Sequence, residues 1–80
     1  MSFSDSIRHI RHHLLLNQQS FADSLHVSLA SVHRWEAGKS IPNLSAMRSL
    51  RDFCESRGLA FETLEKEWLA EKGLEKGADT

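Results

Sequence analysis

Residues 17–42 of the 80-residue chain read NQQSFADSLHVSLASVHRWEAGKSIP, and this stretch decides the fold. It contains two helical patterns of about eight residues each, separated only by the segment from Leu25 to Ser28. Asn17 and Ser28 each precede one pattern and belong to the residue types that favour helix N-termini. So short a connection does not suit an antiparallel hairpin. It predicts a sharp crossing of about 90–120°, as in a helix-turn-helix.

Three further helices are expected around this pair. The spacing of Ile7, Ile10 and Leu14 predicts a first helix, with Ser4 as its candidate cap. After a loop at 39–42, Asn43 is expected to cap a fourth helix that ends at Gly58. The inward residues expected on it are Leu44, Met47, Leu50 and Cys54 or Phe53. A fifth helix is expected at about residues 61–72, so the fold class is all-α, a five-helix bundle.

Composition limits the class of protein. With 40% apolar and 26% charged residues, the chain is expected to fold as one small domain over residues 1–72, followed by a flexible tail at 73–80. No apolar run exceeds three residues, and the N-terminus lacks the apolar stretch of a signal peptide. A lone cysteine, Cys54, fits a reducing compartment. We therefore expect a cytoplasmic protein with no membrane contact.

Charge is unevenly distributed along the chain. Residues 1–58 carry seven Lys or Arg and five Asp or Glu, a net charge of +2, whereas residues 59–80 carry three against six, a net charge of −3. All five histidines lie within the first 33 residues and add partial positive charge near neutral pH. This distribution permits a nucleic-acid partner without by itself indicating one.

The predicted helix at 29–37 has two different faces on a wheel of about 100° per residue. Leu29, Val32, Trp35 and Glu36 fall on or near the inner side, whereas the outer side consists of Ala30, His33, Arg34 and Ala37. Small side chains let a helix enter the DNA major groove, and an arginine matches the acceptors of guanine. The alternative is that Arg34 is an ordinary solvated charge.

This segment resembles the helix-turn-helix of the phage-repressor and Cro-like (XRE-type) DNA-binding family, whose fold is that of the lambda repressor. The matching residues are Gln18, Ala22, Val32, Trp35, Glu36, Gly38, Lys39 and Pro42. The resemblance extends from about Ile7 to Leu64. It implies that the second and third of five helices form the helix-turn-helix.

The resemblance also implies residue roles. Gln18 would touch a DNA phosphate and support the base-reading residues. Further phosphate contacts would come from Ser28, Ser31 and Lys39, and from backbone N–H groups at helix starts and around Gly38. The residues facing base edges would be Leu29, Ala30, His33 and Arg34. Arg11 and Glu36 would form a structural ion pair. The core would contain Ile7, Phe21, Ala22, Leu25, Val32, Trp35, Met47 and Leu50.

Two departures from the family pattern affect these roles. His26 occupies the turn position where the family usually has glycine; this position needs a positive φ, which histidine reaches with little strain. Leu29 and Ala30 replace polar base-reading residues, which leaves contacts to thymine methyl groups. Base discrimination is then expected to depend on Arg34, with His33 a candidate for either a base or a phosphate contact.

Other chemistry has weaker support. His9 and His13 share a helix face but form an incomplete metal site, because no cysteine or acid stands at a completing spacing. No local motif arranges serine, histidine and acid for catalysis, and Cys54 is expected to be a small core residue. We therefore expect neither metal nor cofactor nor enzymatic activity.

The sequence thus predicts a sequence-specific regulator of transcription that binds double-stranded DNA, most simply a repressor acting as a homodimer. Phe61, Leu64 and Trp68 could close the core, but Trp68, Leu69 and Leu74 together suggest surplus apolar surface for a dimer contact. The alternative function is a protein-interaction module, such as an antitoxin that binds a toxin and regulates its own operon. The acidic segment after Gly58 favours that alternative.

Overall fold

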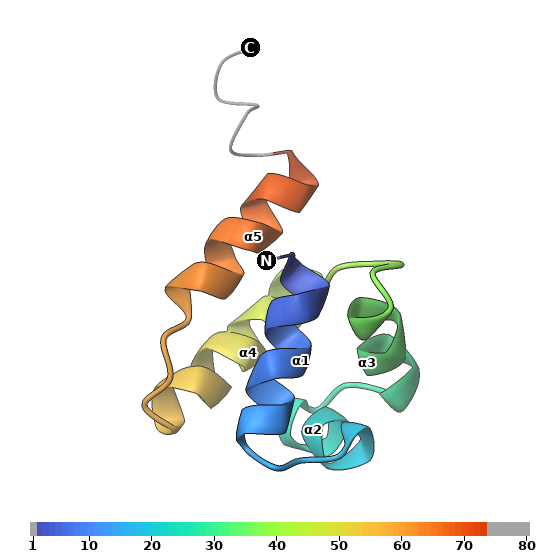
Figure 1. Cartoon of the computed structure of the whole chain (residues 1–80), viewed down its shortest axis with the longest axis vertical. Helices are drawn as coiled ribbons and strands as arrows, with labels where there is room; N and C mark the ends of the chain where they lie inside the picture. Colours follow the sequence, from blue (N-terminus) through green and yellow to red (C-terminus); the bar gives the residue numbers. More distant parts are fainter. Residues whose placement is uncertain (1, 74–80) are drawn as a thin grey trace.

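The computed structural model describes residues 2–73, and all of its regular structure is helical. The elements are α1 (Phe3–His13), α2 (Gln18–Leu25), α3 (Leu29–Glu36), α4 (Leu44–Ser56) and α5 (Glu62–Lys72). In Figure 1, α1 stands at the centre, with α3 on one side of it, α5 on the other and α2 below. The predicted all-α, five-helix fold is confirmed.

Three of the four predicted N-caps are confirmed. The side chains of Asn17, Ser28 and Asn43 each accept a hydrogen bond from the backbone N–H three residues later. The prediction of Ser4 as the cap of the first helix is wrong. Ser2 is the cap, in a reciprocal pair of hydrogen bonds with Asp5. The earlier start places Phe3 one turn before Ile7, so that Phe3 joins the buried stripe of α1 at 1% exposure.

The core contains all eight residues that the family resemblance implied, Ile7, Phe21, Ala22, Leu25, Val32, Trp35, Met47 and Leu50. Phe21 of α2 meets Phe53 of α4 edge to face, with ring centroids 5.5 Å apart, and Phe53 and Cys54 are both buried. The inward placement of Leu44 is wrong, because this side chain is 60% exposed. Leu50, Met47 and Leu44 are spaced by three residues, and each such step turns the helix by about 300°, which is 60° short of a full turn. Two steps back from Leu50 therefore place Leu44 about 120° away from the centre of the buried face.

Helix α5 closes the core over α1. Trp68 is only 6% exposed, and its indole N–H donates a hydrogen bond of 2.7 Å to the carbonyl of Pro42. The interpretation of Trp68 as surplus apolar surface is therefore wrong. Leu69 is half-buried against the core, whereas Leu74 and all but the first residue of the expected tail at 73–80 lie outside the described residues.

Within residues 2–73, two residues other than glycine have left-handed backbone conformations. His26 has φ 58° and ψ 40° at the end of α2, as its turn position requires, so this prediction is confirmed. Leu15, between α1 and α2, has φ 59° and a 91% exposed side chain, and nothing in the sequence indicated it. Gly38, with φ 72°, follows the end of α3, where glycine enters this conformation without strain.

Candidate nucleic-acid interface

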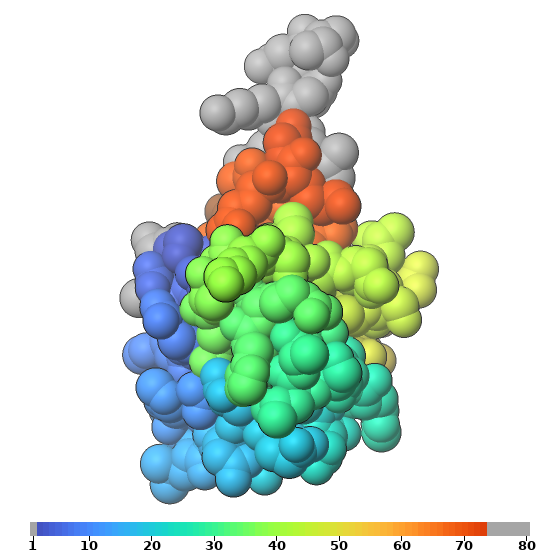
Figure 2. All heavy atoms as spheres, turned by 90° about the vertical axis from the view of Figure 1, so that its right-hand side faces the viewer, coloured from blue at the N-terminus to red at the C-terminus, as the bar shows by residue number. Residues whose placement is uncertain are grey.

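Helix α3 has one buried and one open face. Val32, Trp35 and Glu36 are buried, whereas Ala30, His33, Arg34 and Ala37 are exposed. Figure 2 shows α3 at the centre of one side of the molecule, with α2 below it and the loop after α3 above it. The outward side of α3 is not covered by other parts of the described chain.

The turn between α2 and α3 is closed by backbone hydrogen bonds. With His26 in the left-handed conformation, its N–H donates to Asp23 O at 3.2 Å, and the N–H of Val27 donates to Ala22 O at 3.0 Å. The new helix then begins at Ser28, whose hydroxyl accepts from the backbone N–H of Ser31 at 3.1 Å. The turn thus redirects the chain within three residues and packs α3 against α2.

An ion pair fixes the far end of α3. Arg11 Nε lies 2.7 Å from Glu36 Oε2, and Arg11 Nη2 donates to Glu36 Oε1 at 2.9 Å. Gln18 Nε2 donates to the same Oε1 at 3.1 Å, so side chains from α1 and α2 both hold Glu36. The ion pair that the family resemblance implies is present, and together with the hydrogen bond from Gln18 it connects three helices.

The contacts from Arg11 and Gln18 also stabilise the charged form of the Glu36 carboxylate. Burial by itself raises the pKa of Glu36, but the hydrogen bonds from Arg11 and Gln18 and the positive charge of Arg11 outweigh it and hold the pKa below its ordinary value. Glu36 is the one acid in the α3 sequence. Because Arg11 neutralises it, the formal exposed charge on α3 comes from Arg34.

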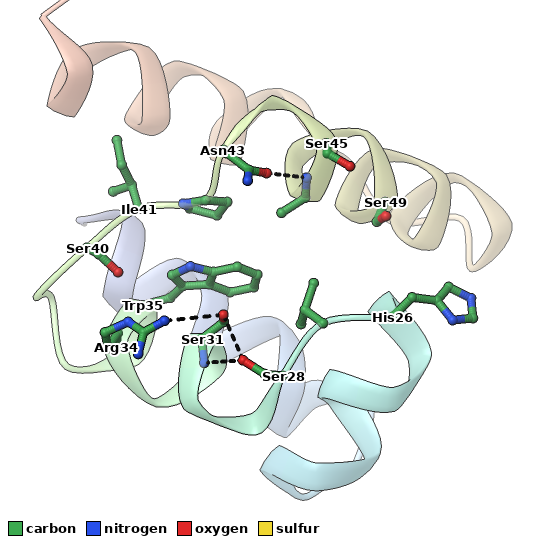
Figure 3. Close-up of a pocket in the computed structure, with 13 residues that line it drawn as sticks. His26, Ser28, Ser31, Arg34, Trp35, Ser40, Ile41, Asn43, Ser45 and Ser49 are labelled. Atoms are coloured by element: carbon green, nitrogen blue, oxygen red, sulfur yellow. Dashed lines mark hydrogen bonds between the residues drawn. The ribbon is translucent and has the colours of Figure 1, made fainter.

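Arg34 lies along α3, beside the first turn of the helix. Its Nη2 is 3.5 Å from Ser31 Oγ, and that hydroxyl is 3.0 Å from Ser28 Oγ, as Figure 3 shows. An arginine side chain carries five N–H donors. The single long contact to Ser31 therefore leaves most of the guanidinium free to bind an external acceptor.

The residues expected at the interface lie on or beside this face. Leu29 and Ser31 are half-buried, whereas Ser28, Ala30, His33, Arg34 and Lys39 are exposed. Gln18 is half-buried and uses one amide proton on Glu36, which leaves the other proton free. The expectation that backbone N–H groups around Gly38 bind phosphate is wrong for Gly38 and Lys39. The N–H groups of Gly38 and Lys39 donate to Trp35 O and Arg34 O at 3.2 and 2.9 Å, so they are not free to bind phosphate.

Sequence reasoning missed a polar groove beside α3. The groove has a volume of about 520 Å³ and separates α3 from the loop at 40–43 and the first half of α4. Ser45 and Ser49 reach it from α4, while Ser31 and Arg34 reach it from α3 (Figure 3). The four-residue spacing of Ser45 and Ser49 was the available signal, because it places both on one helix face. Hydroxyl and guanidinium donors at such a groove suit oxyanion acceptors.

Among residues 2–73, no three histidine, cysteine, aspartate or glutamate side chains gather where they could hold a metal ion. No helix within this range is both long enough and apolar enough to cross a membrane.

Fold and site together define a helix-turn-helix protein, with a short second helix, a tight turn and an exposed third helix. The family model described as helix-turn-helix matches residues 7–58, which is more than half of the chain. The chain therefore belongs to the XRE-type helix-turn-helix family.

The chain is also similar to the HTH-type transcriptional activator BcrR of Enterococcus faecalis. The two are 30% identical over 53 residues, which are 66% of this chain and 26% of that protein. The chain thus spans about a quarter of the length of this relative. No solved structure matches the chain significantly.

Proposed function

We propose that this protein binds double-stranded DNA and regulates transcription, with α3 inserted into the major groove. The observation that carries the proposal is the open face of α3, on which two alanines flank His33 and Arg34 while Val32 and Trp35 anchor the opposite face. The alanines allow close approach to the bases, and Arg34 can donate to both acceptors of a guanine.

The other interface residues contact either bases or phosphates in this proposal. Leu29 and Ala30 contact thymine methyl groups, and His33 contacts a base or a phosphate. Phosphate contacts on the two strands come from Gln18, Ser28, Ser31 and Lys39. These contacts fix the depth and the direction of α3 without reading sequence. With so few cations, one copy makes few phosphate contacts and binds weakly.

The proposed active species is therefore a homodimer that reads two half-sites one helical turn, about 34 Å, apart. We further propose that it acts as a repressor. A domain bound across a promoter blocks polymerase by occupancy alone, whereas activation needs an additional surface that contacts the transcription machinery. The similar protein is named as an activator, so repression and activation need to be distinguished. A reporter assay distinguishes them directly, because transcription falls with a repressor and rises with an activator.

A protein-interaction role is the second candidate, because α5 presents exposed acids such as Glu62 and Glu65 to a basic partner. An antitoxin would combine this role with control of its own operon. The two functions differ in the partner that supplies the salt-sensitive contacts, which is DNA phosphate in the first and a basic protein in the second.

Selection of binding sites from random duplex DNA tests the proposal. We expect an enriched sequence with two half-sites about 10 base pairs apart, and binding that weakens steeply with salt. Absence of any enriched sequence, together with capture of one basic protein from the host lysate, would replace the proposal with the interaction role.

A further inference from the structure

Arg34 stands at one end of a row of hydroxyl groups on the groove side of α3. Its Nη2 donates a hydrogen bond of 3.5 Å to Ser31 Oγ, and Ser31 Oγ lies 3.0 Å from Ser28 Oγ. Ser28, Ser31 and Arg34 follow one another at three-residue spacing, so they share one side of the helix. Figure 3 shows the three side chains joined in this order on the α3 side of the groove.

No counter-charge competes with these hydroxyls for the Arg34 guanidinium. Among residues 2–73, no carboxylate forms an ion pair with it, and no aspartate or glutamate is among the residues that line the groove. An arginine side chain without contacts samples many rotamers, and ordering it on binding costs affinity. Within the described chain, the hydrogen bond to Ser31 is the contact that restrains the Arg34 head group before DNA binds.

Donor and acceptor chemistry gives the row a direction. Arginine has no acceptor, so Arg34 donates and Ser31 Oγ accepts. Donation from a cation polarises the Ser31 hydroxyl and makes its proton the stronger donor, so this proton points to Ser28 Oγ. Ser28 Oγ also accepts from the backbone N–H of Ser31 at 3.1 Å, which occupies its other lone pair. The hydroxyl proton of Ser28 is therefore not used within the row and is free for an external acceptor.

We propose that Ser31 is a positioning residue for Arg34, and that the row from Arg34 through Ser31 to Ser28 couples base reading to one phosphate contact. This inference rests on the proposed binding of DNA by α3 and deepens it. Ser31 accepts from Arg34 and donates its single proton to Ser28, so the phosphate contact belongs to Ser28 rather than to Ser31. Arg34 is oriented in advance, while its other N–H donors stay free for a base.

Substitution of Ser31 in the full chain tests the positioning role. The measurement is base discrimination, defined as the ratio of dissociation constants for two duplexes: the selected one, and one changed at the base pair whose selection depends on Arg34. We expect Ser31→Ala to reduce discrimination about two- to tenfold, as for the loss of one hydrogen bond. Ser31→Thr should restore it, because threonine keeps the hydroxyl.

Ser45→Ala is the matched control for this test. It removes a hydroxyl from the same groove, but from the α4 side and outside the row, so we expect discrimination to be unchanged. Three outcomes would overturn the proposal: no effect of Ser31→Ala, equal losses in Ser31→Ala and Ser45→Ala, or a loss that Ser31→Thr does not restore.

A double-mutant cycle separates positioning from a direct contact. If Ser31 acts through Arg34, adding Ser31→Ala to Arg34→Ala should change base discrimination no further. Additive losses would overturn the proposal, because they would mean that Ser31 acts on DNA independently of Arg34.

Nuclear magnetic resonance relaxation of the Arg34 Nε–H group tests the row without DNA. We expect a lower order parameter, and so a more mobile side chain, in Ser31→Ala than in the original protein or in Ser45→Ala. An unchanged order parameter would overturn the positioning role whatever the DNA assays show. If Arg34→Ala leaves the selected sites unchanged, base reading by Arg34 fails instead, and the order parameter still reports on the row.

Discussion

Arg11 of α1 and Glu36 of α3 are joined at two points, with Nε 2.7 Å from Oε2 and Nη2 2.9 Å from Oε1. Both side chains are largely buried, at 12% and 5% exposure. Arg11 also donates from Nη1 to the carbonyl of Leu16 at 3.0 Å, which ties the link between α1 and α2 to the same group. The last turn of α3 is therefore held by α1 rather than by its own packing alone.

Removing one member of this pair is expected to destabilise the fold strongly. Glu36→Gln leaves the Arg11 guanidinium buried without a counter-charge, at an expected cost of about 3 kcal/mol in the free energy of unfolding at pH 7. Urea denaturation measures the loss. The control is Asp52→Asn, which breaks an exposed pair and is expected to change stability by less than about 0.5 kcal/mol. Equal losses in the two variants would contradict the structural role of the buried pair.

The same variant is expected to reveal a pH dependence. The pKa of Glu36 is lower in the folded protein than in the unfolded chain, so its stabilising effect is complete above the ordinary glutamate pKa of about 4.3. The effect is lost as the pH falls through the lower, folded-state pKa. The stability difference between the original protein and Glu36→Gln should therefore narrow between about pH 5 and pH 2. A constant difference over this range would contradict the lowered pKa.

Arg34→Ala is expected to change DNA specificity and to leave the fold intact, because Arg34 is exposed and its side chain makes one long hydrogen bond, to Ser31, among the described residues. We expect a loss of about 1–3 kcal/mol confined to one base position. Site selection before and after the change measures it. Lys39→Ala is the control. Because Lys39 is proposed to contact a phosphate, its loss should weaken binding to all DNA sequences equally and reduce the salt dependence of binding. Identical selected sites for the original protein and Arg34→Ala would show that Arg34 reads no base.

Trp35→Ala is expected to cost about 3–5 kcal/mol of stability, because it removes a large core side chain from behind α3. Thermal melting followed by circular dichroism detects the loss. His33→Ala, two residues earlier on the same helix but exposed, should change stability by less than about 0.5 kcal/mol. An unchanged melting temperature for Trp35→Ala would mean that the assignment of the two faces of α3 is wrong.

Leu15→Gly is expected to stabilise the protein by about 0.5–1 kcal/mol. A leucine at φ 59° is strained, whereas glycine adopts this conformation freely, and the 91% exposed side chain contributes little packing. The expected gain in the free energy of unfolding is the backbone strain that is relieved, minus the cost of ordering glycine, which has more conformational entropy than leucine in the unfolded chain. The matching substitution Ser20→Gly, inside α2, should instead destabilise by about 0.5 kcal/mol. A loss of stability for both variants would show that Leu15 makes contacts that offset its strain.

Much of the site could be predicted from local sequence signals. The caps Asn17, Ser28 and Asn43 act on backbone groups three residues away, and helical periodicity determines which residues of α3 point inward. The positive φ of His26 was expected from the family resemblance, because His26 occupies the turn position where the family usually has glycine. Caps and helix faces depend on interactions between residues a few positions apart, so the local sequence is enough to predict them.

Other features depended on contacts between distant segments. Trp68 is packed in the core, and its buried indole N–H is satisfied by the carbonyl of Pro42, 26 residues earlier. Phe3 N–H donates to the Glu71 carboxylate, 68 residues away, at 3.0 Å, and so joins the ends of the described chain. Hydrophobic periodicity cannot predict such long-range contacts, because it shows which face of a helix is buried but not which other segment packs against that face.

The sequence by itself therefore determined the helices, the turn and the two faces of α3. Only the tertiary structure decided that Leu44 stays exposed, that Trp68 closes the core and that the N–H groups of Gly38 and Lys39 are already bonded. The physical reason is range: capping and periodicity operate within a few residues, whereas burial depends on how all the helices pack together.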